Sequence, residues 1–398
     1  MKRFVSILLV VLLCLSVFAC GAKDDSKEES KGNVVEGNVI YVGVFEPTTG
    51  ENGGGGMQEV LGIRYANSLF NTVTINGTEY EIQLVEVDNQ SDKTAAVTAA
   101  QTLVSSNVIA VLGSYGSGVS IAAGETFANA KVPAVGVSCT NPQVTEGNDW
   151  YFRVCFLDPF QGTVMASYAW DQGYTKAAII SQNGDDYSTG LAAYFKIAFE
   201  KLGGEIVAEE TYQTNETDFN AILTKVNASG AEVLFVPSSI QTATLLLPQA
   251  KALGISAAIM AGDTWENETI ISDAAEGVTF STFFDENNDA NEIAKEFVSG
   301  FKAWLNADPE NLKLNGGTDG VAAVSALGFD AYMVVYEALE RLTETNSVAM
   351  REALVATDYM GVTGSVTFNE VGDANKDTAY IKTVQGGKFV FIKTQVAE

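Results

Sequence analysis

The stretch from Val111 to Thr145, VLGSYGSGVSIAAGETFANAKVPAVGVSCTNPQVT, decides how this chain folds. Two apolar runs flank a segment with helical spacing, and each run ends in a cluster of Gly, Ser and Thr. The runs are continuous rather than alternating, which is typical of strands covered by helices on both faces of a parallel sheet. In open α/β sheets, ligands bind beyond the carboxyl ends of the strands. The stretch therefore predicts a doubly wound α/β layer with a small-molecule site at its edge.

The alternation of strands and helices continues along most of the chain. The first strands are predicted at residues 40–45, 81–88, 108–114 and 132–138, with helices at 57–70, 94–106 and 120–130. After residue 157 the pattern restarts, with helices at 160–170, 189–203, 219–230 and 242–254 and strands at 176–181, 205–212, 233–238 and 257–263. Two α/β layers of similar size in tandem predict two lobes.

The C-terminal part of the chain follows a different pattern. Helical spacing at 291–305, 320–343 and 347–356 precedes short strands at 364–370, 379–384 and 388–393, which we expect to form a meander. A chain that adds helices and strands after two complete α/β layers is expected to return over both of them. Several crossings between the two lobes would form a hinge.

The composition excludes several classes of function. The chain has 398 residues, 46% hydrophobic and 18% charged, which is a globular composition with room for two domains. Lys and Arg number 23 against 50 Asp and Glu, so the net charge is −27 and we expect no nucleic-acid partner. The absence of histidine removes Ser-His-Asp and Cys-His nucleophile systems and the commonest zinc ligand. We therefore expect a protein that is not an enzyme and has no cofactor or metal.

The first 20 residues, MKRFVSILLVVLLCLSVFAC, have the pattern of an export signal. Lys2 and Arg3 precede an apolar run of about 15 residues, which is too short for a stable spanning helix. Residues 17–21 resemble a bacterial lipoprotein box, which predicts lipidation of Cys20. The alternative is a plain signal peptide with an incidental cysteine. Residues 21–37 are charged and lack apolar periodicity, so we expect a flexible tether.

Two further features concern disulfide and metal chemistry. Cys139 and Cys155 remain in the predicted body, and the sequence leaves open whether they form a disulfide or stay as buried thiols. A calcium-loop spacing begins at Asp285, but Ala290 occupies the position that such a loop gives to glycine. We expect no calcium site there.

The predicted strand ends of the first lobe carry glycines and hydroxyls. Ser117 and Gly118 stand where a helix begins, and Ser138 and Thr140 follow the next strand. Free backbone N–H groups at a helix start, together with a serine hydroxyl, suit a carboxylate or another anion. The first lobe therefore offers an anion site.

The predicted strand ends of the second lobe carry an aromatic hydroxyl and a carboxylate. Residues 182–187 include Tyr187, Ser239 follows a later strand, and Asp263 closes the strand before Trp265. A buried carboxylate is costly unless it is paired, so Asp263 suits an ammonium group. An anion site and a cation site on facing lobes match a zwitterion such as a free amino acid.

Several segments carry a resemblance to a known family. In order along the chain they are IYVGVFEPTTGENGG, QLVEVDNQSDKTAAVTAAQTLVSSNVIAVLGSYGSG, VPAVGVSCTNPQVTEG, FRVCFLDPFQG, VLFVPSSIQ and AGDTWEN. They are similar to the leucine/isoleucine/valine-type periplasmic binding proteins, the substrate-capturing components of branched-chain amino-acid ABC transporters. The resemblance covers residues from about Asn38 to Lys393. It implies an α/β clamshell of two doubly wound lobes joined by a three-strand hinge, with lobe 1 at 38–157 plus 287–358 and lobe 2 at 158–286 plus 359–398.

The resemblance also implies roles for individual residues. The ligand's α-carboxylate would be held by Ser117, Ser138 and Thr140, and its α-amino group by Asp263. Tyr187 would close over the ligand. The predicted ligand-binding residues are Ser117, Gly118, Ser138, Thr140, Tyr187, Ser239 and Asp263.

Two departures from the family concern the pocket for the ligand's side chain. Family members often have Gly-Tyr-Tyr where this chain has residues 238–240, Ser-Ser-Ile. Some relatives place a large side chain where this chain has the glycines 53–56. Both changes are expected to enlarge the pocket or alter its polarity.

The resemblance implies a monomer outside the cytoplasm, lipid-anchored to the bacterial membrane. It would capture an L-amino acid, branched-chain or related, and deliver it to an ABC permease and its ATPase. The alternatives are a non-amino-acid ligand, such as an amide, an aromatic acid or a nucleoside, and delivery to a sensory receptor.

Overall fold

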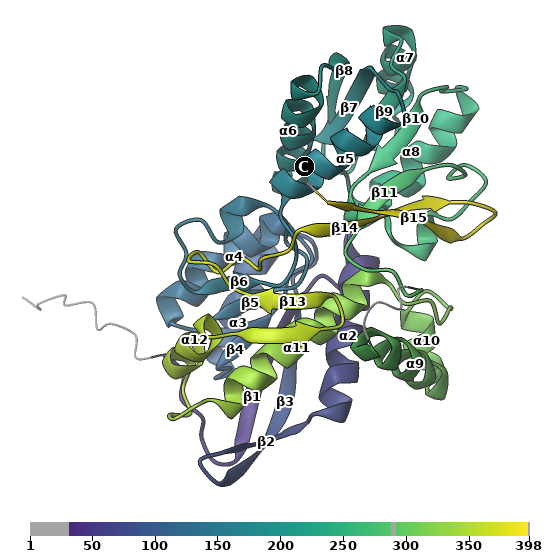
Figure 1. Ribbon diagram of the computed structural model, residues 1–398. Coiled ribbons are helices and arrows are strands. Elements are labelled where there is room, and N and C mark those ends of the chain that lie inside the picture. Colours follow the sequence, from purple (N-terminus) through teal and green to yellow (C-terminus); the bar gives the residue numbers. More distant parts are fainter. Residues whose placement is uncertain (1–31, 288–291, 397–398) are drawn as a thin grey trace, which may run out of the picture. The chain divides into compact units, whose positions relative to one another are not determined.

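The computed structural model describes residues 32–287 and 292–396 and contains two large sheets (Figure 1). The first has the order β2 (Thr72–Ile75), β3 (Thr78–Asp88), β1 (Val39–Glu46), β4 (Ala110–Leu112), β5 (Ala134–Gly136) and β6 (Tyr151–Arg153). All neighbours from β3 to β6 are parallel, and only β2 runs antiparallel to β3. The sequence indicated β1, β3, β4 and β5 but neither the hairpin strand β2 nor the edge strand β6.

Helices cover both faces of the first sheet because its strands present apolar side chains on both sides. On one face α2 (Gly53–Leu69) packs against α11 (Ala323–Glu340), and on the other α3 (Lys93–Ser105) packs against α4 (Ser117–Ala130). Along β1, Val42 and Val44 belong to the first core, whereas Phe45 belongs to the second. Residues of alternate parity thus serve opposite faces, as strand geometry requires. The remaining helices after the second lobe are α9 (Glu292–Ala307), α10 (Pro309–Leu314) and α12 (Ser347–Val355).

The second sheet also consists of a parallel part and an antiparallel edge. Its order is β15 (Phe389–Val396), β14 (Thr378–Val384), β11 (Thr279–Thr282), β10 (Ala258–Ala261), β9 (Val233–Phe235), β7 (Lys176–Gln182) and β8 (Glu205–Tyr212). The strands from β11 to β8 are parallel, and the β14–β15 hairpin adds antiparallel to β11. The helices of this lobe are α5 (Asp158–Asp171), α6 (Asp186–Lys201), α7 (Asn220–Ser229) and α8 (Ile240–Ala252).

The predicted C-terminal meander is wrong for its first strand, whereas its last two strands, β14 and β15, form the expected antiparallel hairpin. Strand β13 (Gly364–Thr367) pairs with β12 (Asp358–Gly361) in a separate two-stranded sheet, not with β14. The carboxylate of Asp330 in α11 accepts hydrogen bonds from the backbone N–H groups of Val362 and Thr363, so this hairpin is held against a helix of the first sheet. The alternation of side chains marks a strand but does not choose its partner.

The chain passes three times between the two sheets: after β6, after β11 and after the β12–β13 hairpin. Two of these passages are tied together by a buried ion pair, in which Arg153 Nε lies 2.6 Å from Asp373 Oδ1. The two doubly wound lobes with three crossings confirm the predicted fold class.

Among the described residues no helix is both long and apolar enough to span a membrane. The predicted signal, Cys20 and the part of the predicted tether up to residue 31 lie outside the described residues. The rest of that predicted tether contacts the body of the protein, because Asn33 Nδ2 donates to Val108 O at 2.8 Å and Val35 N donates to Thr345 O at 2.9 Å.

Candidate ligand-binding site

The edges of the two sheets place the predicted residues at the starts of helices. Ser117 is the first residue of α4, and its Oγ accepts a hydrogen bond from Asn141 N at 3.2 Å. Ser239 precedes α8, and its Oγ accepts from Thr242 N, also at 3.2 Å. Glycine, serine and aspartate are common at such positions because the first N–H groups of a helix lack internal partners. The residues that favour the start of each helix are therefore also the polar groups at the ends of the preceding strands.

Three of the predicted residues meet at one small cavity between the lobes. Ser117, Tyr187 and Ser239 line a space of about 20 Å³, and Gly118 lines a neighbouring space of about 40 Å³. The other residues around the first space are Glu51, Asn52, Tyr115, Gly116, Gln182, Asp185 and Thr264. Pockets that hold small molecules usually measure about 300 to 1,000 Å³. A ligand of amino-acid size therefore needs the lobes to separate or the lining to move.

The lobes touch each other around this cavity. Tyr115 OH of the first lobe donates to Thr264 O of the second at 3.2 Å, and Asn141 Nδ2 donates to Asp186 O at 2.7 Å. Lys93 Nζ forms an ion pair with Asp186 at 2.8 Å. Contacts of this kind exist only when the edges of the lobes meet, so they are the groups that opening would expose.

The space expected beside the four glycines is filled by an aromatic ring. Residues 53–56 form the first turn of α2, and a Cβ on Gly55 would lie 2.4 Å from the ring of Tyr115. A Cβ on Gly56 would lie 2.1 Å from Pro47 O. These glycines permit close approach, and the expectation that they enlarge the pocket does not hold in this conformation.

Tyr187 and Asp263 form one unit of the second lobe. Asp263 is buried, and its Oδ1 accepts from Gln161 Nε2 at 2.7 Å and from Tyr187 OH at 3.0 Å. Burial raises the pKa of Asp263 to about 6, while these two donors hold it down. A cation placed against this carboxylate would favour the charged form.

Ser138 and Thr140 lie behind the cavity rather than in its lining. Ser138 Oγ donates to Glu59, and both side chains are buried. Thr140 Oγ1 is buried without a hydrogen bond of good geometry, and it faces the carboxylate of Asp158. Thr140 therefore has unused hydrogen-bonding capacity, whereas the hydroxyl of Ser138 donates to an acid.

Buried acids surround the predicted site. Burial raises the pKa of Glu46 to about 8, that of Asp158 to about 8, and that of Glu59 well above its usual value. Each also feels at least one other acid of the group, because Glu59 interacts with Glu46 and Asp263, and Asp158 with Asp263. Perturbed acids of this kind are typical of functional sites.

Buried polar atoms without a hydrogen-bond partner also gather here. Within the described ranges they include Asn52 Oδ1 and Gln161 Oε1. The carboxyl groups of Glu46 and Glu59 instead interact with each other, and that of Asp158 interacts with Thr140. Unpaired buried atoms are uncommon in folded proteins and need an explanation at each site. Asn52 lines the cavity and Gln161 contacts Asp263, so these two unpaired oxygens mark places where a polar ligand can complete the hydrogen bonds.

Sequence reasoning missed several residues of this site. Glu46 is the last residue of strand β1, whose carboxyl end lies at the same edge as those of β4 and β5, so the strand-end rule could have found it. Glu59 and Gln161 sit inside helices, and Glu51 lies in a loop. No sequence pattern marks these three residues, because only the packing of the lobes brings them to the site.

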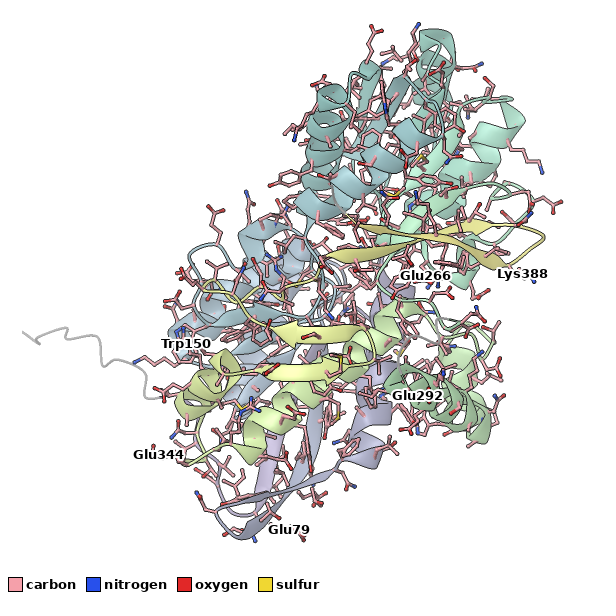
Figure 2. All side chains as sticks on the ribbon, viewed as in Figure 1. Glu79, Trp150, Glu266, Glu292, Glu344 and Lys388 are labelled. Carbon is pink, nitrogen blue, oxygen red and sulfur yellow. The ribbon has the colours of Figure 1, made fainter. Side chains whose placement is uncertain are left out.

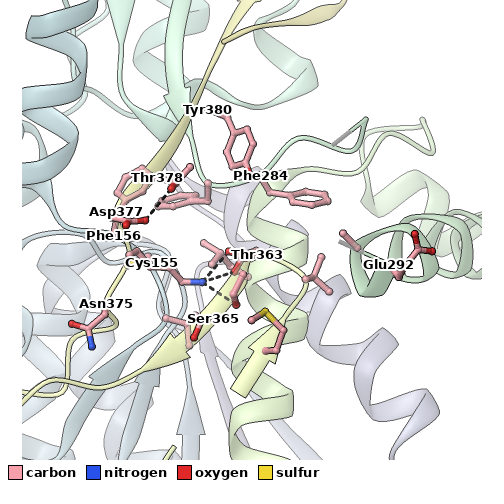
Figure 3. Close-up of a pocket in the computed structure, with 18 residues that line it drawn as sticks. Cys155, Phe156, Phe284, Glu292, Thr363, Ser365, Asn375, Asp377, Thr378 and Tyr380 are labelled. Atoms are coloured by element: carbon pink, nitrogen blue, oxygen red, sulfur yellow. Dashed lines mark hydrogen bonds between the residues drawn. The ribbon is translucent and has the colours of Figure 1, made fainter. Parts of the chain in front are cut away.

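A larger cavity of about 690 Å³ lies elsewhere, between the β12–β13 hairpin, α9 and the crossing segments (Figure 3). Its walls include Phe156, Phe284 and Tyr380, and Lys376 Nζ donates there to Thr363 O at 3.0 Å. None of the seven predicted residues lines it. We place the site at the small cavity because the strand ends meet there and buried acids lie directly behind its lining, where Tyr115 N donates to Glu46 and Tyr187 OH donates to Asp263.

Other expectations can be compared with the described residues. Cys139 and Cys155 are both buried free thiols, so the disulfide alternative is wrong. No group of three or more metal-ligating side chains occurs in residues 32–287 and 292–396. Two positions of the calcium-loop spacing, Asp289 and Asn291, lie outside the described residues.

Two α/β lobes with a polar cleft between their strand ends define a solute-binding protein. The sequence model for the periplasmic binding protein family matches residues 39–388, and the chain belongs to that family.

The chain is similar to several characterised proteins. The leucine-binding protein LivK of Thermotoga maritima is 30% identical with a TM-score of 0.82, over 90% of this chain and 99% of that one. LivJ of Streptococcus pneumoniae, a branched-chain amino acid transporter substrate-binding protein solved with isoleucine, is 28% identical with a TM-score of 0.78, over 90% of this chain and 99% of that one. An amino acid binding protein of Pseudomonas aeruginosa is 35% identical over 56% of this chain, but the match spans only 60% of that relative's length.

Proposed function

We propose that this protein captures an L-amino acid, branched-chain or related, between its lobes and delivers it to an ABC permease. The observation that carries the proposal is the pairing of opposite chemistries across one cleft. Ser117, Gly118 and Thr140 offer hydroxyl and N–H groups from the first lobe, and Asp263 with Tyr187 offers a carboxylate from the second. The similarity to LivK, a leucine-binding protein, and to LivJ, a branched-chain amino acid transporter substrate-binding protein, supports the class of ligand and transporter.

In this proposal each lobe holds one end of the ligand. The α-carboxylate binds at the N-terminus of α4, where the backbone N–H groups and the helix dipole favour an anion. Ser117 Oγ and Thr140 Oγ1 complete its hydrogen bonds. The α-ammonium group binds Asp263, whose orientation is held by Gln161 and Tyr187. Because each lobe contributes one end, the ligand stabilises the closed form and shifts the population toward it.

The location of the protein is part of the proposal. A periplasmic binding protein works outside the cytoplasm, and we propose that lipidation of Cys20 tethers this one to the membrane as a monomer. Delivery to a permease with its ATPase follows from the class. Delivery to a sensory receptor remains the alternative, and reconstituted transport with the permease distinguishes the two.

A thermal-shift screen tests the proposed ligand class. The purified protein is stripped of ligand by unfolding and refolding, and is then heated with each of the twenty amino acids, amides, nucleosides and aromatic acids. A ligand present at 100 times its Kd adds about 2.7 kcal/mol to the free energy of unfolding. We expect a rise in Tm with a few L-amino acids and none with their deaminated analogues. A shift with another class alone would contradict the amino-acid proposal while leaving the family intact.

A further inference from the structure

The cavity between the lobes has an unusual lining for a pocket that receives a branched aliphatic side chain. Its described lining contains two tyrosines but no Val, Leu, Ile, Met or Phe side chain. The groups other than those assigned to the ligand's two charged ends are mostly polar: Glu51, Asn52, Gln182, Asp185, Ser239 and Thr264. An aliphatic side chain placed there would desolvate polar groups without replacing their hydrogen bonds, which is unfavourable.

Glu51 is the acid of this lining that lacks a close partner. Gln182 Nε2 approaches its two carboxylate oxygens only at 3.3 and 3.4 Å, and no described Lys or Arg forms an ion pair with it. Lys93, which lines the neighbouring space with Glu51, is used by Asp186 and Gly184 O. Burial and the nearby Asp185 raise the pKa of Glu51 to about 7. Its carboxylate can therefore accept a cation without breaking an existing pair.

Asn52 adds a further acceptor beside Glu51, and Gln241 helps to fix the position of Glu51. Asn52 Oδ1 is buried and has no hydrogen-bond partner. Glu51 O accepts from Gln241 N of the second lobe at 3.3 Å, which places the acid at the contact between the lobes. Three acceptor oxygens of Glu51 and Asn52 thus stand beside one space, and a group that carries several N–H donors and a positive charge complements them.

We propose that the ligand is an L-amino acid with a cationic side chain, an amine or a guanidinium, which Glu51 and Asn52 receive while Asp263 receives the α-ammonium group. The proposal rests on the proposed function, because it assumes that an amino acid occupies this cleft. The charges support it, since a zwitterion with a neutral side chain brings one positive charge to Asp263 and none to Glu51.

A pair of matched ligands tests the proposal. L-lysine and L-norleucine have the same carbon chain, and only lysine carries the terminal ammonium. We expect calorimetry with the refolded protein to show at least tenfold tighter binding for lysine, ornithine or arginine than for norleucine and leucine. Tighter binding of leucine, norleucine or glutamine would overturn this inference and leave the proposed function standing. Failure of all amino acids to bind would instead overturn the proposed function.

A matched pair of variants locates the effect at Glu51. Glu51→Gln keeps the shape of the side chain and removes its charge, so it should weaken binding of the cationic amino acid at least tenfold and change binding of norleucine less than twofold. The control is Glu79→Gln, because Glu79 is exposed on the β2–β3 hairpin (Figure 2) and should change neither affinity. Equal weakening of both ligands by Glu51→Gln would overturn the assignment. If that variant does not fold, the lysine and norleucine comparison with the unaltered protein decides.

Discussion

Buried acids occur in two regions of this molecule, and the two regions differ in whether these acids form ion pairs. Near the crossings, Lys382 Nζ lies 2.5 Å from Glu266 Oε1 and 3.2 Å from Asp285 Oδ2, and Arg153 pairs with Asp373 (Glu266 is labelled in Figure 2). Behind the lining of the cleft, Glu46, Glu59, Asp158 and Asp263 are also buried, but none of them has an ion-pair partner among the described residues.

This difference distinguishes acids that stabilise the fold from acids that belong to the candidate ligand site. A buried acid next to a fixed cation is compensated within the protein, so it serves the stability of the lobes or their orientation. A buried acid without a cation has its pKa raised by burial, which is a cost that folding alone does not explain. We therefore interpret the unpaired group as the ligand site and the paired group as the supporting frame.

The largest expected effect comes from breaking the paired region. Lys382→Met leaves Glu266 and Asp285 buried without their cation, which should lower the free energy of unfolding by about 3 to 5 kcal/mol. Urea denaturation of the ligand-free protein measures this loss. The triple variant that also carries Glu266→Gln and Asp285→Asn removes the unpaired charges and should regain part of the stability. A loss below about 1 kcal/mol would show that these ion pairs do not support the fold.

The opposite result is expected at the cleft. Asp263→Asn should weaken binding of the amino acid by about 2 to 5 kcal/mol, because one partner of a buried charge pair is lost. The ligand-free variant should be no less stable than the parent, since the acid has no cation to lose. Calorimetry and urea denaturation on the same samples measure both quantities. Unchanged affinity would remove Asp263 from the site.

Changing the pH should sharpen the same comparison. The pKa of Asp263 in the ligand-free protein is raised to about 6, so below pH 6 the carboxyl is protonated and no longer attracts an ammonium group. We expect Kd to increase up to tenfold for each pH unit below 6, as measured by calorimetry in buffers of equal ionic strength. Asp263→Asn should flatten this dependence for L-norleucine, whose neutral side chain does not require the charge of Glu51, an acid with a pKa of about 7. A parent profile that is flat between pH 5 and 7 would contradict the role of Asp263.

The stability of the ligand-free protein should depend on pH in the opposite sense. Acids whose pKa is raised by folding bind protons more tightly in the folded state, so stability increases as pH falls through the folded pKa. For Glu46 and Asp158 that value is about 8, which predicts a higher Tm at pH 6 than at pH 9. The replacements Glu46→Gln and Asp158→Asn should reduce the difference. A Tm that rises from pH 6 to 9 would contradict unpaired burial of these acids.

The smallest effect concerns Ser239, which is both a predicted ligand residue and a helix cap. Loss of the cap in Ser239→Ala should reduce the free energy of unfolding by about 1 kcal/mol, because Thr242 N loses its acceptor. Ser239→Asp restores a capping acceptor and should regain that stability. Binding affinity separates the two roles, since a capping residue changes stability with little change in Kd.

The sequence by itself determined the two tandem α/β layers and the first outline of the site. Continuous apolar runs identify buried strands, helical spacing identifies the covering helices, and both are local patterns that need no knowledge of distant partners. The rule that ligands bind at the carboxyl ends of parallel strands then pointed to Ser117, Ser239 and Asp263. It could be applied because the end of each apolar run, and the residues that follow it, can be read from the sequence. The absence of histidine, which is also a property of the sequence alone, excluded nucleophile systems that depend on histidine and the commonest zinc ligand.

Only the tertiary structure decided which groups from distant parts of the sequence contact one another. Tyr115 fills the space beside Gly55, Glu51 meets Gln182 of the other lobe, and the hairpin after α11 packs on Asp330 instead of joining β14. These contacts join residues far apart in the sequence, and each depends on packing between whole elements. The periodicity of apolar residues indicates which face of a helix or strand is buried, but it does not indicate which other element packs against that face. For this reason the elements could be predicted from the sequence, whereas the contacts between them could not.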